Sequence, residues 1–181
     1  MQPFSDADRD GDKTMSNDQA KGHDSRGIAN IFVEKAKTTP GAAGPLTIMS
    51  LLKYVYLAHG WTLGYTDKPL ICHTVEAWKY GPVVPEVYRA FSKQGMYITQ
   101  MERFSINPFH SDKPALSDTD MQQKIINAVY KEYSSKSAVH LSELTHRVGT
   151  PWHQFRHIHY GKIPNDAIHK YYKNLVETQQ Q

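Results

Sequence analysis

The stretch from Leu46 to Tyr65 constrains the fold more than any other segment, because its apolar residues fall on nearly every side of a helix. A surface helix shows apolar residues only at every third or fourth position, so this one is expected to be surrounded by the rest of the chain. Lys53, His59 and Gly60 interrupt the stretch and argue against a membrane span. We therefore predict a buried central helix that ends near Gly64.

Amphipathic segments with start and stop signals predict the helices that cover this centre. Apolar residues at helical spacing begin at Ile28 and run to Pro40-Gly41. Val84-Pro85 predicts another start, because proline suits the first helical position, and this helix runs to Gly95. Four more helices are expected to begin at Ser117, Ser137, Thr150-Pro151 and Pro164-Asn165-Asp166. The helix that begins at Ser117 is predicted to turn inward Met121, Ile125, Ala128, Val129 and Tyr133. The helix that begins at Pro164 is predicted to turn inward Ile168, Tyr171, Tyr172 and Leu175.

Strand signals are few and short. Leu70-Ile71 and the segment 75–78 are possible strands, and residues 96–106 alternate enough for a strand pair or an extended arm. The sequence contains no internal repeat. We therefore expect a mainly α protein, an α+β chain with a small antiparallel β element, folded as one compact helical domain.

The first 27 residues have the composition of a disordered acidic tail, with six aspartates and almost no large apolar side chain. Within it, the run from Asp6 to Asp12 has the spacing of the first half of an EF-hand loop. The bidentate glutamate of such a loop is absent, because Asn17 stands at its position. We expect a solvated tail over 1–27, a folded domain over 28–176 and a flexible end over 177–181.

The charge balance is too even to indicate a nucleic-acid-binding surface. The 181 residues carry 21 Lys and Arg against 18 Asp and Glu, a net charge of +3. The single Cys72 excludes an internal disulfide, and no charged-then-apolar leader precedes the first helix. We expect a soluble cytoplasmic protein that contacts no membrane.

The segment from Glu76 to Tyr88 is the strongest candidate for a binding surface. Prolines 82 and 85 stiffen its backbone, Gly81 permits a turn, and Trp78, Tyr80 and Tyr88 are large amphipathic rings. Such rings make good interface anchors because they lose little conformational freedom on binding. In the alternative interpretation, this corner only joins a strand to a helix and its rings belong to the core.

Three other groupings invite a chemical interpretation. His153 and His157 would share one face of a helix, as zinc ligands do, but neither a nearby cysteine nor the glutamate of a metalloprotease motif accompanies them. Cys72 and His73 would point to opposite faces of a strand and so could not form a nucleophile–base pair. We therefore predict no catalytic residue, metal site or cofactor. A moderate basic face could form near the C-terminus from Arg147, Arg156, Lys162, Lys170 and Lys173.

Several motifs, taken together and in order, resemble the Panacea domain family, which includes the SocA-type antitoxins and phage-associated GepA-type proteins. The resemblance covers about residues 28–176. It is carried by Lys53-x-x-Tyr56-x-Ala58-His59-Gly60-Trp61, by Glu76-Ala77-Trp78-x-Tyr80-Gly81-Pro82-Val83-Val84-Pro85, by Leu141-Ser142-x-Leu144-Thr145-His146 with Pro151-Trp152, and by Ile163-Pro164.

The resemblance implies a non-enzymatic antitoxin that binds and neutralises a co-encoded toxin protein. An alternative role, also implied by the family, is a proteolytic adaptor that delivers the toxin to a ClpXP-type protease. An RNA-binding regulator that uses the basic face is a more remote alternative. The family-motif positions expected to bind the partner are Trp78, Tyr80, Pro82, Val83, Tyr88, His146 and Trp152.

Overall fold

A computed structural model of the chain describes residues 22–39, 44–104, 121–158 and 161–179. Over these residues the chain is mainly helical, with one small three-stranded antiparallel sheet. The expected fold class is confirmed. Within this described part, no helix combines the length and the apolar character needed to cross a lipid bilayer.

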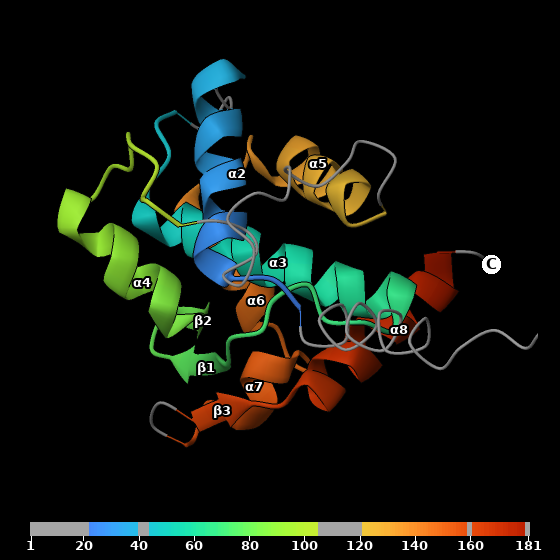
Figure 1. Cartoon of the computed structure of the whole chain (residues 1–181). Helices are drawn as coiled ribbons and strands as arrows, with labels where there is room; N and C mark the ends of the chain where they lie inside the picture. The colour runs from blue at the N-terminus through green and yellow to red at the C-terminus, as the bar shows by residue number, and fades with distance from the viewer. Residues whose placement is uncertain (1–21, 40–43, 105–120, 159–160, 180–181) are drawn as a thin grey trace, which may run out of the picture.

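Helix α3, residues Ile48–Thr66, is the predicted central helix, and Figure 1 shows it running through the middle of the molecule. The Thr47 hydroxyl caps its first turn by accepting from the Ser50 N–H at 3.1 Å. Helices α2 (Ser25–Thr38), α5 (Met121–Tyr133) and α8 (Asn165–Gln179) pack around it. Because neighbours cover it on several sides, almost every residue from Ser50 to Gly64 is buried.

Helices α3 and α8 form the most extensive contact in the molecule, and Gly60 makes it possible. The ring of Tyr172 lies so close to Gly60 that a Cβ there would fall 2.2 Å from it. The Tyr172 ring is buried and also packs edge-on against Trp61, with centroids 5.2 Å apart. Helix α8 continues to Gln179, so residues 177–179, expected to be a flexible end, are helical.

The folded region begins earlier than expected, because residues 22–27 are part of the structure and not of a tail. Helix α2 starts at Ser25, and its N-cap residue, Asp24, is only 2% exposed. The His23 N–H donates to the Leu70 carbonyl, and the His23 carbonyl accepts from the Cys72 N–H, which fixes the segment beside residues 70–72. The acidic run from Asp6 to Asp12 lies outside the described residues.

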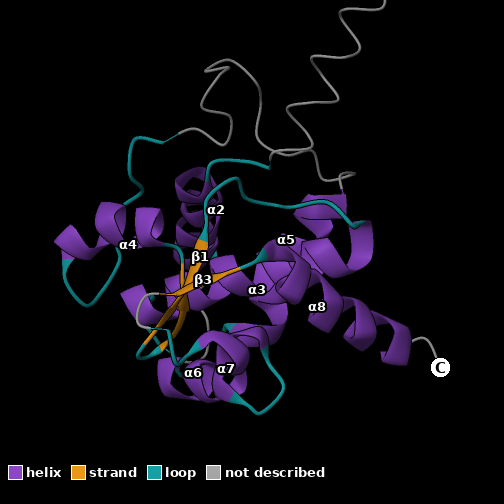
Figure 2. Cartoon of the chain, turned by 90° about the horizontal axis from the view of Figure 1, so that it is seen from below, coloured by secondary structure: helices purple, strands orange, loops and turns teal. Residues whose placement is uncertain are grey.

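The sheet has the strand order β2-β1-β3 and lies below the first half of α3 (Figures 1 and 2). Strand β1 (Val75–Trp78) was predicted, whereas β2 (Gly81–Val83) and β3 (Gly161–Ile163) were not. The two missed strands have three residues each, too few to show an alternating pattern. At Leu70-Ile71 the chain forms only an isolated bridge between Ile71 and His23, and over the described part of 96–106 only one between Tyr97 and Thr47.

The local helix signals are confirmed, but one inner face is wrong. Helix α4 (Pro85–Phe91) follows Val84, α6 (Ala138–His146) follows the Ser137 cap, and α7 (Pro151–Phe155) follows the Thr150 cap. A short 3-10 helix, Ser92–Gln94, extends α4 towards Gly95. The expected start of α5 at Ser117 lies outside the described residues. Its buried face is Gln123, Ile125, Ile126, Val129 and Tyr130, while Met121 and Ala128 are exposed.

Candidate functional site: an aromatic cleft over a buried lysine

The β1–β2 hairpin gives the candidate segment its shape. Trp78 pairs with Gly81 across the hairpin, so Lys79 and Tyr80 form a two-residue turn. Gly81 has a φ of 110°, a left-handed conformation that glycine adopts without strain. After β2, Val84 leads into α4, which places the ring of Tyr88 beside the hairpin. The backbone of the hairpin and of α4 therefore fixes the points from which the aromatic rings project.

A cleft of about 380 Å³ opens between this hairpin, α4 and the first turns of α3. Four of the seven predicted binding residues line it, all from the segment 78–88, and the opposite wall comes from the first turns of α3. Its lining is Ile48, Met49, Leu52, Lys53, Ala77, Trp78, Lys79, Tyr80, Val83 and Tyr88.

The rings of the cleft differ in how far they are fixed by the fold. Trp78 is half-buried, its Nε1–H donates to Glu76 Oε2 at 2.8 Å, and its ring meets that of Tyr88 edge-on with centroids 5.1 Å apart. Tyr80 is 57% exposed and Tyr88 38% exposed. Lys79 Nζ lies 5.3 Å from the centroid of the Tyr80 ring. The two tyrosines therefore present the accessible aromatic surface, and Trp78 supports it.

Pro82 and Val83 are buried, and Pro82 contributes through its backbone. The fully buried Lys53 of α3 reaches the hairpin and donates from Nζ to the Pro82 carbonyl at 3.1 Å. A Cβ on Gly81 would lie 2.7 Å from Lys53 Nζ, so the turn can approach the ammonium only because residue 81 is glycine. Burial lowers the pKa of Lys53 to about 7 from its ordinary 10.5.

His146 and Trp152 lie outside the lining of the cleft and support the hairpin instead. Their rings stack with centroids 3.8 Å apart, and the Trp152 Nε1–H donates to the carbonyl of Trp78 at 2.8 Å. The Ser142 hydroxyl donates to the Tyr80 carbonyl at 3.0 Å. Burial, followed by the charge of Lys53, lowers the pKa of His146. Helices α6 and α7 thus hold the end of β1 and the turn in place.

Sequence reasoning did not select Lys53, Met49 or Lys79 as site residues. Lys53 gives the clearest signal of the three, because it is the one lysine within the apolar stretch that forms α3. A lysine in such a helix either extends its ammonium to the surface or buries it, and a buried ammonium marks a candidate functional position. Nothing in the local pattern shows that α3 and the hairpin, 29 positions apart, meet around it.

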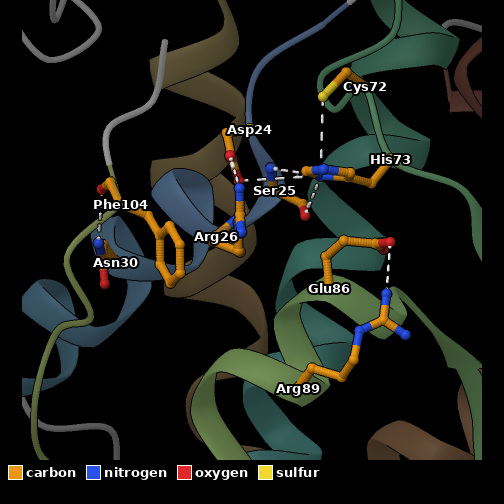
Figure 3. A network of polar contacts seen from close by, with 9 residues as sticks. All are labelled: Asp24, Ser25, Arg26, Asn30, Cys72, His73, Glu86, Arg89 and Phe104. Atoms are coloured by element: carbon orange, nitrogen blue, oxygen red, sulfur yellow. Dashed lines mark hydrogen bonds and ion pairs between the residues drawn. The ribbon is translucent and has the colours of Figure 1, made fainter. Parts of the chain in front are cut away.

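Cys72 and His73 are not on a strand, so the expectation that they point apart is wrong. Cys72 Sγ lies 3.8 Å from His73 Nδ1, but the same ring nitrogen lies 2.8 Å from the Ser25 hydroxyl (Figure 3). In a nucleophile–base pair, one ring nitrogen of the histidine contacts the thiol and the other contacts an orienting group. Here the thiol and the Ser25 hydroxyl both contact the same nitrogen, Nδ1 of His73. Burial and then the charge of Asp24 raise the pKa of the thiol, which disfavours the reactive thiolate.

The remaining histidines and bases do not form the arrangements considered from the sequence. Helix α7 ends at Phe155, so His153 and His157 do not share one helix face. Among the described residues, no three His, Cys, Asp or Glu side chains gather as metal ligands would. On the basic face, Lys173 already pairs with Asp67 at 2.8 Å.

Comparisons with known proteins support the family resemblance that the sequence motifs indicate. The family described as "Antitoxin SocA-like, Panacea domain" matches residues 51–153, a segment that contains most of the cleft together with His146 and Trp152. The protein "Antitoxin SocA" of Caulobacter vibrioides (strain NA1000 / CB15N) is 33% identical over 132 residues, 71% of this chain and 68% of that protein. No solved structure matches the chain. The chain therefore belongs to the antitoxin SocA-like, Panacea domain family.

Proposed function

We propose that the protein is an antitoxin that binds a co-encoded toxin protein directly and neutralises it through the aromatic cleft. The observation that carries the proposal is the exposure of Tyr80 and Tyr88 on a rigid hairpin and helix, at the edge of a cleft lined mainly by apolar side chains. Family membership and the name of the relative in Caulobacter vibrioides support the antitoxin role.

The cleft has the physical properties of a protein-binding hot spot. Binding energy concentrates at aromatic residues that lose water and little conformational freedom when a partner covers them. The backbone of Tyr80 is fixed by the turn and by Ser142, and the ring of Tyr88 is held against Trp78, so the positions from which both rings act are set before a partner arrives. His146 and Trp152 would act indirectly, by holding the hairpin.

The proposed role needs no catalytic group. The partner would be neutralised because the antitoxin covers part of its surface, and the cleft offers two lysines and aromatic rings without an acid–base pair. We propose no cofactor and no nucleic-acid ligand for this activity.

Co-expression tests the proposal. The protein encoded next to this one would be expressed alone, then with the wild-type chain, and then with Tyr80→Ala/Tyr88→Ala. The proposal predicts growth arrest, relief by the wild type, and loss of relief by the double variant at equal protein level. Tyr65→Ala is the matched control, since Tyr65 is 46% exposed near the opposite end of α3.

Three outcomes would contradict the proposal. A neighbouring protein that does not arrest growth, or an arrest that the wild-type chain cannot relieve, removes the antitoxin role. If the double variant relieves growth arrest as well as the wild type does, the cleft is not the site that binds the toxin. Repeating the assay in a host without ClpX separates direct neutralisation, which persists, from delivery to a ClpXP-type protease, which fails.

A further inference from the structure

Lys53 is buried without a charged partner among the described residues. Its side chain is fully enclosed, although it belongs to the lining of the cleft. Its one hydrogen bond within the described residues goes to the neutral carbonyl of Pro82. An ammonium has three N–H donors, so two of them have no acceptor in this part of the chain.

Such a position is costly for a lysine. A buried charge is normally paired with an opposite charge, and a methionine of similar length would fill the same space without the cost of removing an ammonium from water. The low pKa of Lys53, near 7, reflects this cost. Groups that are unfavourable for stability concentrate at functional sites, where a ligand completes their interactions.

The charged side chains that line the cleft, Lys53 and Lys79, are both basic. Lys79 lines the same cleft, and His146 lies close enough for the charge of Lys53 to lower its pKa. His146 Nε2 is itself buried without a hydrogen-bond partner among the described residues. Glu76 is the acid of β1, and its carboxylate accepts from the Trp78 indole. The one polar contact of Lys53 among the described residues is with the neutral Pro82 carbonyl, and burial lowers its pKa.

We propose that the cleft binds an acidic side chain of the partner protein, with Lys53 as the buried counter-ion and the rings of Tyr80 and Tyr88 around an adjacent apolar residue. The inference rests on the proposed function and adds the chemistry of the partner segment: an aspartate or glutamate next to a large apolar side chain. The carboxylate supplies the acceptors that Lys53 lacks, and the desolvated pair is strong because little water competes for it.

The first test needs no partner. The Lys53 side chain, labelled with ¹³C at Cε, would be titrated by NMR with indole-3-propionate and with indole-3-propionamide, an aromatic carboxylate and its neutral analogue. A bound carboxylate raises the pKa of the amine by about one unit or more. We expect this shift with the acid and not with the amide. Equal titration curves with both probes would overturn the proposal.

Two variants locate the effect. Lys53→Met removes the buried ammonium, and Lys79→Met removes the exposed one from the same cleft. Saturable, carboxylate-dependent binding is expected to disappear in the first and persist in the second. Because Lys53→Met exchanges a buried charge for an apolar chain of similar size, its melting temperature should be at least that of the wild type. A folded Lys53→Met protein that still binds the carboxylate contradicts the proposal.

The partner itself provides the second test. Each Asp and Glu of the neutralised protein would be changed to Asn or Gln and its affinity measured against the wild-type chain and Lys53→Met. One acid is expected to lower wild-type affinity at least about tenfold while leaving the affinity for Lys53→Met unchanged. If the wild type binds and no acid behaves in this way, the inference fails while the proposed function stands. If the probe titration succeeds and the neighbouring protein does not bind, the proposed function fails instead.

Discussion

At the scale of single residues, the contact between Gly81 and Lys53 decides the shape of the cleft. The Lys53 Cε and Nζ atoms and the Thr145 hydroxyl all lie where a side chain at position 81 would begin. The turn therefore rests directly on the buried ammonium, and the Pro82 carbonyl meets it at 3.1 Å. A Cβ at position 81 would displace either the end of the Lys53 side chain or the hairpin itself.

Gly81→Ala is predicted to destabilise the protein by about 2–4 kcal/mol, because it adds steric overlap to the strain of a left-handed alanine. Gly95→Ala is the matched control. Gly95 also has a positive φ, 88°, but a Cβ there would meet nothing within 4 Å. The control should cost about 1–3 kcal/mol in urea unfolding, from the strain of its glycine-only backbone conformation alone. Equal losses for the two variants would show that the contact with Lys53 is unimportant.

Lys53 also predicts how stability depends on pH. The unfolded lysine keeps its proton up to about pH 10.5, whereas the folded one loses it near 7. Between these values the unfolded state binds more protons, so the free energy of unfolding rises with pH through this residue. The difference in stability between the wild type and Lys53→Met should therefore shift towards the wild type from about pH 7 to about pH 10. Parallel urea-unfolding profiles for the two proteins would contradict the assigned burial of the charge.

At the scale of elements, the start of α2 shows how a short segment joins the domain. Asp24 caps the helix through the Arg26 N–H at 2.8 Å and pairs with the Arg26 guanidinium at 2.6 Å. Burial acts to raise the pKa of Asp24, but these bonds and the charge of Arg26 lower it overall. Arg26 in turn lies 3.9 Å above the ring of Phe104, so one cap connects α2 to the loop after α4 (Figure 3).

Asp24→Ala is predicted to cost about 2 kcal/mol, since it removes the cap and leaves Arg26 without its partner. Asp24→Asn keeps an acceptor for the cap and should lose less than half as much. The carboxylate stabilises the fold above its ordinary pKa of 3.8, and this contribution is lost as the pH falls below that value. Thermal unfolding at neutral and acidic pH checks both statements, and an Asp24→Ala protein as stable as the wild type would refute them.

Elements with local signals were predictable from the sequence, and elements set by distant contacts were not. Thr150-Pro151 and Val84-Pro85 determine helix starts through their own backbone and side chains, so their neighbours suffice. Strand β3 exists because β1 lies beside it, and nothing within its three residues indicates this. The expected inner face of α5 included Ala128, which is exposed, because the angle at which α5 meets α3 decides which residues are covered.

At the scale of the whole molecule, α3 carries two regions with different roles. Its second half packs against α8 through Gly60 and Tyr172 and stabilises the core. Its first turns form one wall of the cleft and supply Lys53. Four predicted binding residues meet in that cleft because the hairpin motif is continuous in sequence. His146 and Trp152 were grouped with them by the family motif, although their contacts are those of a support.

The measurement that tests the central claim most directly is calorimetric titration of the purified chain with the neighbouring protein. The account predicts a saturable one-to-one complex with the wild type and with Tyr65→Ala. It predicts an affinity at least about tenfold lower for Tyr80→Ala/Tyr88→Ala, with an unchanged melting temperature. Equal affinity of the wild type and the folded double variant would show that the toxin binds elsewhere and would contradict the assignment of the cleft.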